Sequence, residues 1–126
     1  MKRNIIITVL SLLIVFCSYT LFNMNVSAAN NINRAISMGM ADGVAEYLAS
    51  DLELSLYGRL NNCSREQATQ VLHEFFRQNK PAEYSGVNNS NIVSGMLTTY
   101  DGKTYKVDYT LKTLNNKECI IGLYVY

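Results

Sequence analysis

The sequence predicts a single α+β domain: a helix or helix pair, one strand, a capped helix, and then a sheet of about four antiparallel strands. Three observations predict it. Apolar residues recur every three or four positions in the first half of the chain. A Ser-x-x-Gln capping sequence begins at Ser64. The second half alternates apolar and polar residues around an Asp101-Gly102 pair, which is typical of a hairpin turn.

Residues 1–29 have the composition of a secretory leader. Lys2 and Arg3 are followed by a nearly unbroken apolar run over residues 5–16, and small residues occupy the stretch before position 30. We expect a signal peptidase to cleave after Ala28 or Ala29, so that residues 30–126 form an exported domain, periplasmic or secreted. The protein would then contact the membrane only through the leader, before cleavage.

Two other fates of this segment stay open. Residues 5–22 are long enough to remain as an uncleaved membrane anchor. Cys17 could instead carry a lipid, but Phe16 before it is a bulky ring where a lipoprotein peptidase prefers a small residue.

The charge and the counts of reactive residues exclude several classes of function. The chain has 126 residues, 48% of them apolar, which fits one small domain. Without the leader, 9 basic and 10 acidic residues remain, too balanced for a nucleic-acid surface. One His and three Cys lack the short paired spacings of a closed four-ligand zinc site, and no glycine-rich phosphate loop is present. We therefore expect no metal, no cofactor and no nucleic-acid partner.

The first half of the domain is predicted to change from helix to strand and back. Residues 31–50 have helical spacing, with Gly39 and Gly43 suggesting a break and a second helix over 42–49. Residues 52–57 alternate as a half-buried strand does, and residues 58–62 are predicted to turn the chain.

The helix that begins after Ser64 is the strongest element. It has the capping box described above and one continuous apolar stripe, and Pro81 stops it. The stripe consists of Ala68, Val71, Leu72, Phe75 and Phe76. His73 lies off this stripe, so we interpret the lone histidine as a solvated helix residue.

The remaining chain is predicted to form hairpins. Residues 92–100 and 103–114 flank the Asp101-Gly102 turn, and Asn115-Asn116 turns the chain into a last strand over 118–126. That last strand is apolar on both faces, so it is either central or meets a partner. Strict alternation puts Cys119, Ile121, Leu123 and Val125 on one face and Ile120, Tyr124 and Tyr126 on the other.

Cys63 and Cys119 remain once the leader is removed. In an oxidising compartment they could form one disulfide, closing a long loop at about 4 kcal/mol of stabilisation on the chain-entropy model. Alternatively, Cys119 is a small buried residue of a strand and Cys63 lies in a loop. The sequence leaves both possibilities open.

The order of elements and several short patterns resemble a known family. The order is similar to the cone-shaped fold of the nuclear transport factor 2-like (cystatin-like) superfamily. Within it, the chain most resembles domain of unknown function 4783, found in small exported proteins mostly of Bacteroidota. The resemblance is carried by Ser64–Ala68, Val71-Leu72, Phe75-Phe76, Asn79–Pro81, Ser94–Thr99, Gly102, Tyr105–Val107, Leu111-Lys112 and Ile120–Val125. It implies a curved sheet that forms a cone, and it brings no catalytic residues.

Related folds such as ketosteroid isomerases use a pocket Asp as base with Tyr and a second acid as oxyanion hole. Here Asp108 falls on the polar side of its strand and Asp51 at a helix end, while Tyr47 and Tyr57 could line the opening of the cone. No acid–base constellation emerges, which argues against an enzyme.

We therefore predict a non-enzymatic binding or assembly module. It would hold a small apolar ligand in the cone, or a protein partner or second copy on the outer sheet face through Ile120, Tyr124 and Tyr126. The alternatives are a small hydrolase or isomerase built around Tyr47, Tyr57 and a carboxylate, and a companion domain that stabilises another exported protein.

Overall fold

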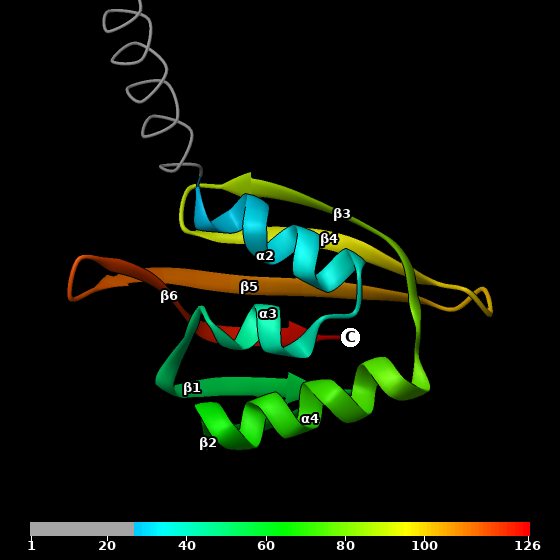
Figure 1. Cartoon of the computed structure of the whole chain (residues 1–126), viewed down its shortest axis with the longest axis horizontal. Coiled ribbons are helices and arrows are strands. Elements are labelled where there is room, and N and C mark those ends of the chain that lie inside the picture. Colours follow the sequence, from blue (N-terminus) through cyan, green and yellow to red (C-terminus); the bar gives the residue numbers. More distant parts are fainter. Residues whose placement is uncertain (1–26) are drawn as a thin grey trace, which may run out of the picture.

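The computed structural model describes residues 27–126, in which three helices lie on one face of a curved, six-stranded sheet (Figure 1). The predicted α+β class is confirmed, with six strands where about five were expected. The predicted leader lies outside the described residues except for its end. The elements are α2 (Ala28–Ser37), α3 (Ala41–Ala45), β1 (Leu48–Leu56), β2 (Arg59–Ser64), α4 (Arg65–Gln78), β3 (Pro81–Asn89), β4 (Ile92–Thr99), β5 (Thr104–Leu114) and β6 (Lys117–Val125).

The strands are ordered β2-β1-β6-β5-β4-β3. Every neighbouring pair is antiparallel except β1 and β6, which run parallel. This pairing places the last strand in the middle of the sheet, beside the first hairpin. A central position explains why β6 is apolar on both faces.

Two predictions for the first half are wrong. The second helix ends at Ala45, and Leu48 and Ala49 belong to β1, where Leu48 pairs with Ile120 of β6. Residues 59–62 are strand, not turn, because Tyr57 and Gly58 alone reverse the chain at φ +53° and +82°. Two consecutive residues with positive φ make the tight turn that matches the twist of a hairpin.

Other local predictions are confirmed. At the start of α4, the Gln67 amide donates to Ser64 Oγ at 3.2 Å and the Ser64 amide donates to Gln67 Oε1 at 3.0 Å. Gly102 has φ +85° in the β4–β5 turn, and Asn115 and Asn116 have φ +51° and +62° in the β5–β6 turn. These contacts are local in sequence, so local patterns were enough to predict them.

The outer-face prediction for Ile120 is wrong. Thr110 and Leu111 of β5 pair with Gly122 and Ile120 of β6, so Ile121 is an extra residue between them. Such a bulge reverses the alternation of side chains along the strand. Ile120 consequently lies on the inner face with Leu123 and Val125 and has no exposed surface.

None of the helices between residues 27 and 126 is both long and apolar enough to cross a membrane.

Candidate functional site

The interior of the cone is filled by side chains. Leu72, Phe75 and Phe76 of α4 pack toward Leu97 and Leu123 on the inner face of the sheet, and all five are buried. The cavity between these residues measures about 10 Å³. That is room for about one water molecule, so the interior has no space for a substrate or a small apolar ligand.

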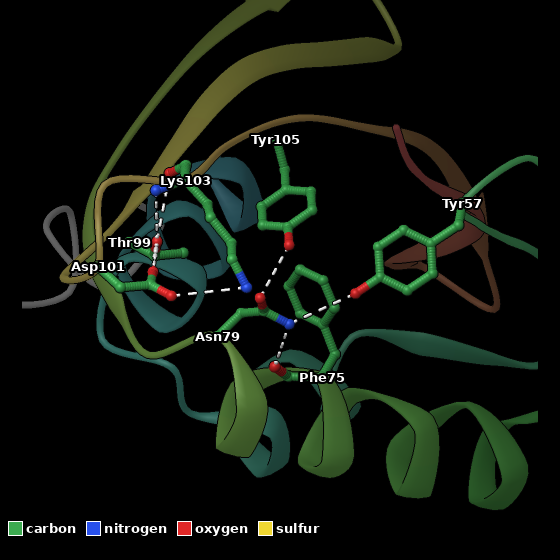
Figure 2. Close-up of polar contacts among 7 residues, drawn as sticks. All are labelled: Tyr57, Phe75, Asn79, Thr99, Asp101, Lys103 and Tyr105. Carbon is green, nitrogen blue, oxygen red and sulfur yellow. Dashed lines mark hydrogen bonds and ion pairs between the residues drawn. The ribbon is translucent and has the colours of Figure 1, made fainter.

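A polar cluster closes the mouth of the cone, at the end of α4 (Figure 2). The Asn79 side chain, which is 3% exposed, lies between two tyrosines. Its Nδ2 donates to the Phe75 carbonyl at 3.1 Å and to the Tyr57 hydroxyl at 3.4 Å. The Tyr105 hydroxyl donates to Asn79 Oδ1 at 2.8 Å. Asn79 therefore ties the helix end to the β1–β2 turn and to β5.

Aromatic rings cover this cluster and fix its hydroxyls. Tyr105 packs edge-on against Phe75 with ring centroids 5.2 Å apart, and Tyr57 lies 6.1 Å from Tyr105. Burial and the neighbouring Tyr57 hydroxyl raise the pKa of Tyr105. The Tyr105 hydroxyl therefore stays protonated at neutral pH, as a hydrogen-bonding group and not as a base.

The adjoining β4–β5 turn has its own polar contacts (Figure 2). The Thr99 hydroxyl donates to Asp101, and Lys103 Nζ lies 3.5 Å from the Asp101 carboxylate. The hydrogen bond from Thr99 is the main reason that the pKa of Asp101 is lowered. An ionised, already bonded carboxylate at the mouth is a turn-forming group and a poor general base.

The two tyrosines predicted to line one opening are far apart. Tyr47 precedes β1 and Tyr57 follows it, so nine strand residues separate them, or about 30 Å of extended chain. Tyr47 is half-buried and accepts a hydrogen bond from Asn31 at 2.9 Å. Only Tyr57 reaches the mouth, so these two residues do not form a common site.

The candidate carboxylates and the histidine also lie away from the cone interior. Asp51 and Asp108 both neighbour core residues in their strands, so they point to the outer face. Asp108 Oδ1 is buried without a hydrogen-bond partner, while Lys106 Nζ lies 3.6 Å from Oδ2. His73 is exposed and contacts Asp42 of α3 at 2.9 Å, which agrees with its predicted place on the helix surface.

Among the described residues, 27–126, Cys63 and Cys119 are both free. Cys63 pairs with the core residue Leu52 and packs against the core, so it faces inward. Cys119 precedes the inward-facing Ile120, so it points to the outer face, and β1 lies between their two strands. Opposite faces of a sheet and an intervening strand exclude a disulfide between these two cysteines in this conformation, which was one of the two possibilities that the sequence left open.

The outer face of the sheet carries exposed apolar side chains. Among residues 27–126, ten large apolar residues are exposed, and six of them lie on this face by strand alternation: Leu60, Val87, Ile92, Met96, Leu114 and Tyr126. Leu114 is 37% exposed, and each of the other five is at least 50% exposed. The half-buried Tyr124 lies at the centre, paired with Asp108 on one side and Ser55 on the other. Tyr124 and Tyr126 thus keep their predicted place, and Ile120 does not.

Clusters that could hold a metal ion are absent from the described part of the chain: no three His, Cys, Asp or Glu residues converge there.

Residues 29–125 match the family described as "Domain of unknown function (DUF4783)". The chain belongs to this family. The match spans every described helix and strand apart from Ala28, the first residue of α2, so the DUF4783 domain and the folded domain coincide. No match was found among curated proteins.

Solved structures agree with the DUF4783 assignment. A DUF4783 family protein from Bacteroides ovatus is 24% identical with a TM-score of 0.69, covering 75% of this chain and 90% of that one. A second, from Bacteroides fragilis, is 21% identical with a TM-score of 0.71, covering 75% and 93%. A putative ketosteroid isomerase from Shewanella frigidimarina is 13% identical with a TM-score of 0.55, covering 79% and 91%. These similarities confirm the nuclear transport factor 2-like fold.

The polar cluster at the mouth of this DUF4783 domain was not predicted from the sequence. Asn79 was predicted only as part of the helix-ending Asn79-Lys80-Pro81. An asparagine at a helix end usually satisfies local backbone groups, and here it also bonds to two tyrosines that are distant in sequence. The sequence feature that pointed toward such a cluster was the high tyrosine content, nine residues in all. That content does not show which tyrosine side chains contact one another.

Proposed function

We propose that this DUF4783 protein is a non-enzymatic assembly module that forms a homodimer through the outer face of its sheet. The observation that carries the proposal is the number of exposed apolar side chains on that face, which lie along β2, β3, β4, β5 and the end of β6. Exposed apolar surface of this extent on a small domain usually marks an interaction site.

The size of the face supports a dimer. The sheet is six strands wide and most strands are eight or nine residues long. At ordinary strand spacing and rise, the face measures about 800 Å². A stable interface buries about that area on each partner.

Charge supports a second copy as the partner. The central strand β6 is flanked by β1, with Asp51 and Glu53 on the outer face, and by β5, where Lys106 and Lys112 outnumber Asp108 on that face. A two-fold axis parallel to β6, between two stacked sheets, places β1 of one copy against β5 of the other. Acidic and basic side chains then face each other twice across one interface.

The filled interior weighs against the alternative of a hydrolase or isomerase in the cone. The ketosteroid isomerase neighbour shares the fold at 13% identity, which carries no activity over to this chain. Leu72, Phe75 and Phe76 occupy the space that a substrate would need. No carboxylate borders the remaining cavity.

Sedimentation velocity with a Tyr124→Lys variant tests the proposal. We expect the wild-type domain to be dimeric at micromolar concentration and the variant to be monomeric, since a lysine at the centre would be buried against its own symmetry mate. Gln70→Lys, which adds the same charge to the exposed surface of α4, is the matched control and should remain dimeric. A monomeric wild-type protein, or a dimeric Tyr124→Lys variant, would refute the proposal.

A further inference from the structure

A second surface lies on the other side of the molecule, between α4 and the β1–β2 hairpin. Two adjoining hollows of about 550 Å³ and 570 Å³ share Leu56, Tyr57 and Val71. We call their combined surface the hairpin groove. Its remaining lining residues are Leu54, Arg59, Asn61, Gln67, Gln70, Glu74, Phe75 and Gln78.

The groove exists because α4 starts directly where β2 ends. β2 finishes at Ser64 and α4 begins at Arg65, so helix and strand diverge from one point. Four residues of the apolar stripe of α4 are buried in the core, and the fifth, the half-buried Val71, lies on the flank of the helix that faces the hairpin. The inward-facing side chains Arg59 and Asn61 of β2 consequently stay exposed.

We propose that the hairpin groove binds an extended peptide segment of a partner protein, which adds to β2 as a further strand. β2 is an edge strand, so one side of its backbone has no partner strand in the sheet. Unpaired edge backbone is a template for an added strand, and neighbouring hollows then take alternate side chains. This surface is separate from the outer face proposed for the dimer.

The charged residues that line the groove determine which charge the bound peptide should carry. The Glu74 carboxylate already accepts hydrogen bonds from Arg77 and from Gln78 Nε2 at 2.9 Å. Hydrogen bonding from Arg77 lowers the pKa of Glu74, so it stays ionised and paired. Arg59 has no acidic partner within the described part of the chain. The groove therefore favours a segment with one acidic side chain opposite Arg59.

The length of the groove and its other lining residues determine the rest of the peptide sequence that the groove favours. Along α4, the groove runs from Gln67 to Gln78, which is about 16 Å of helix. That length matches about five residues of extended chain. The floor is apolar, with Leu54, Leu56 and Val71. The preferred segment thus alternates, with apolar side chains on either side of the acid pointing into the groove.

The test uses two synthetic peptides with blocked ends: Thr-Val-Thr-Glu-Thr-Val-Thr and the same peptide with Lys in place of Glu. Binding to the ¹⁵N-labelled domain is followed by chemical shifts. We expect the Glu peptide to perturb β2 and the Val71 side of α4 at millimolar concentration. It should bind about two- to fivefold more tightly than the Lys peptide, as for other exposed ion pairs.

Variants make the test specific. Arg59→Glu should reverse the preference between the two peptides, and Val71→Lys should abolish binding of the Glu peptide. Asn88→Lys on β3, at the opposite edge of the sheet and off its outer face, changes an exposed residue; it is the control and should bind as the wild type does. Absence of binding, perturbation of β3 or of the outer face in place of β2, or an unchanged preference in Arg59→Glu would overturn the proposal. The dimer is read out separately by sedimentation.

Discussion

The two faces of the sheet are built from the same strands but differ in burial and in role. The inner face is closed: its apolar side chains are buried under the helices, and the polar groups of Tyr84 and Tyr109 are hydrogen-bonded at 2.9 Å and 2.7 Å. The outer face is open, with exposed apolar residues and a buried Asp108 oxygen that has no partner. The inner face therefore determines stability, and the outer face is available for association.

The largest expected effect is on the inner face. Phe75→Ala should lower the free energy of unfolding by about 3–5 kcal/mol, because it empties the centre of a closely packed core. The Phe75 ring contacts Tyr57, Phe76 and Tyr105. Urea denaturation measures the loss, with Met96→Ala on the outer face as the control, expected within about 0.5 kcal/mol of wild type. A loss below about 1 kcal/mol for Phe75→Ala would mean that the interior is loosely filled.

A pair of glycines sharpens the comparison. A Cβ on Gly95, which faces inward, would lie 2.4 Å from the Ser85 carbonyl oxygen and 2.6 Å from the buried Tyr84 ring. A Cβ on Gly122, which faces outward, would meet the Tyr124 hydroxyl at 2.5 Å, and that half-buried side chain can rotate away. Gly95→Ala should cost about 1–3 kcal/mol, as overpacking does, and Gly122→Ala less than about 1 kcal/mol. Equal losses in urea denaturation would contradict the distinction between the faces.

The smallest expected effect is a pH dependence of the inner face. Burial raises the pKa of Tyr84 and of Tyr109 far above that of a free tyrosine. Both groups favour the protonated form in the folded state, so their contribution to stability is complete below about pH 10 and is lost as the pH rises above it. Urea midpoints at pH 8, 10 and 11 should fall with pH. In Tyr84→Phe they should fall less steeply, and an identical slope would contradict this.

Local features were predictable because their contacts are local. The capping box at Ser64 and Gln67 and the turns at Asp101-Gly102 and Asn115-Asn116 involve residues at most three positions apart. The Tyr57-Gly58 turn was missed because a tyrosine rarely adopts positive φ. The extra strand β2 was missed with it.

The candidate site was less predictable than the fold. Ile120 was assigned to the wrong face because one extra residue, Ile121, reverses the alternation, and strict alternation contains no sign of a bulge. Tyr57 was predicted to lie at the opening, but the residues around it are distant in sequence. Asn79 follows Tyr57 by 22 residues, and Tyr105 follows Asn79 by 26 residues. Contacts between residues so far apart in sequence depend on long-range packing.

The sequence by itself determined the α+β class, the helix that begins after Ser64, two hairpin turns and the balance of charge. Each follows from the chemistry of neighbouring residues. The tertiary structure decided that β6 lies beside β1, that Phe75 and Phe76 fill the cone, and that apolar side chains remain on the outer face. These outcomes depend on which distant strands pair, and pairing is settled by the burial of the whole core and not by any one segment.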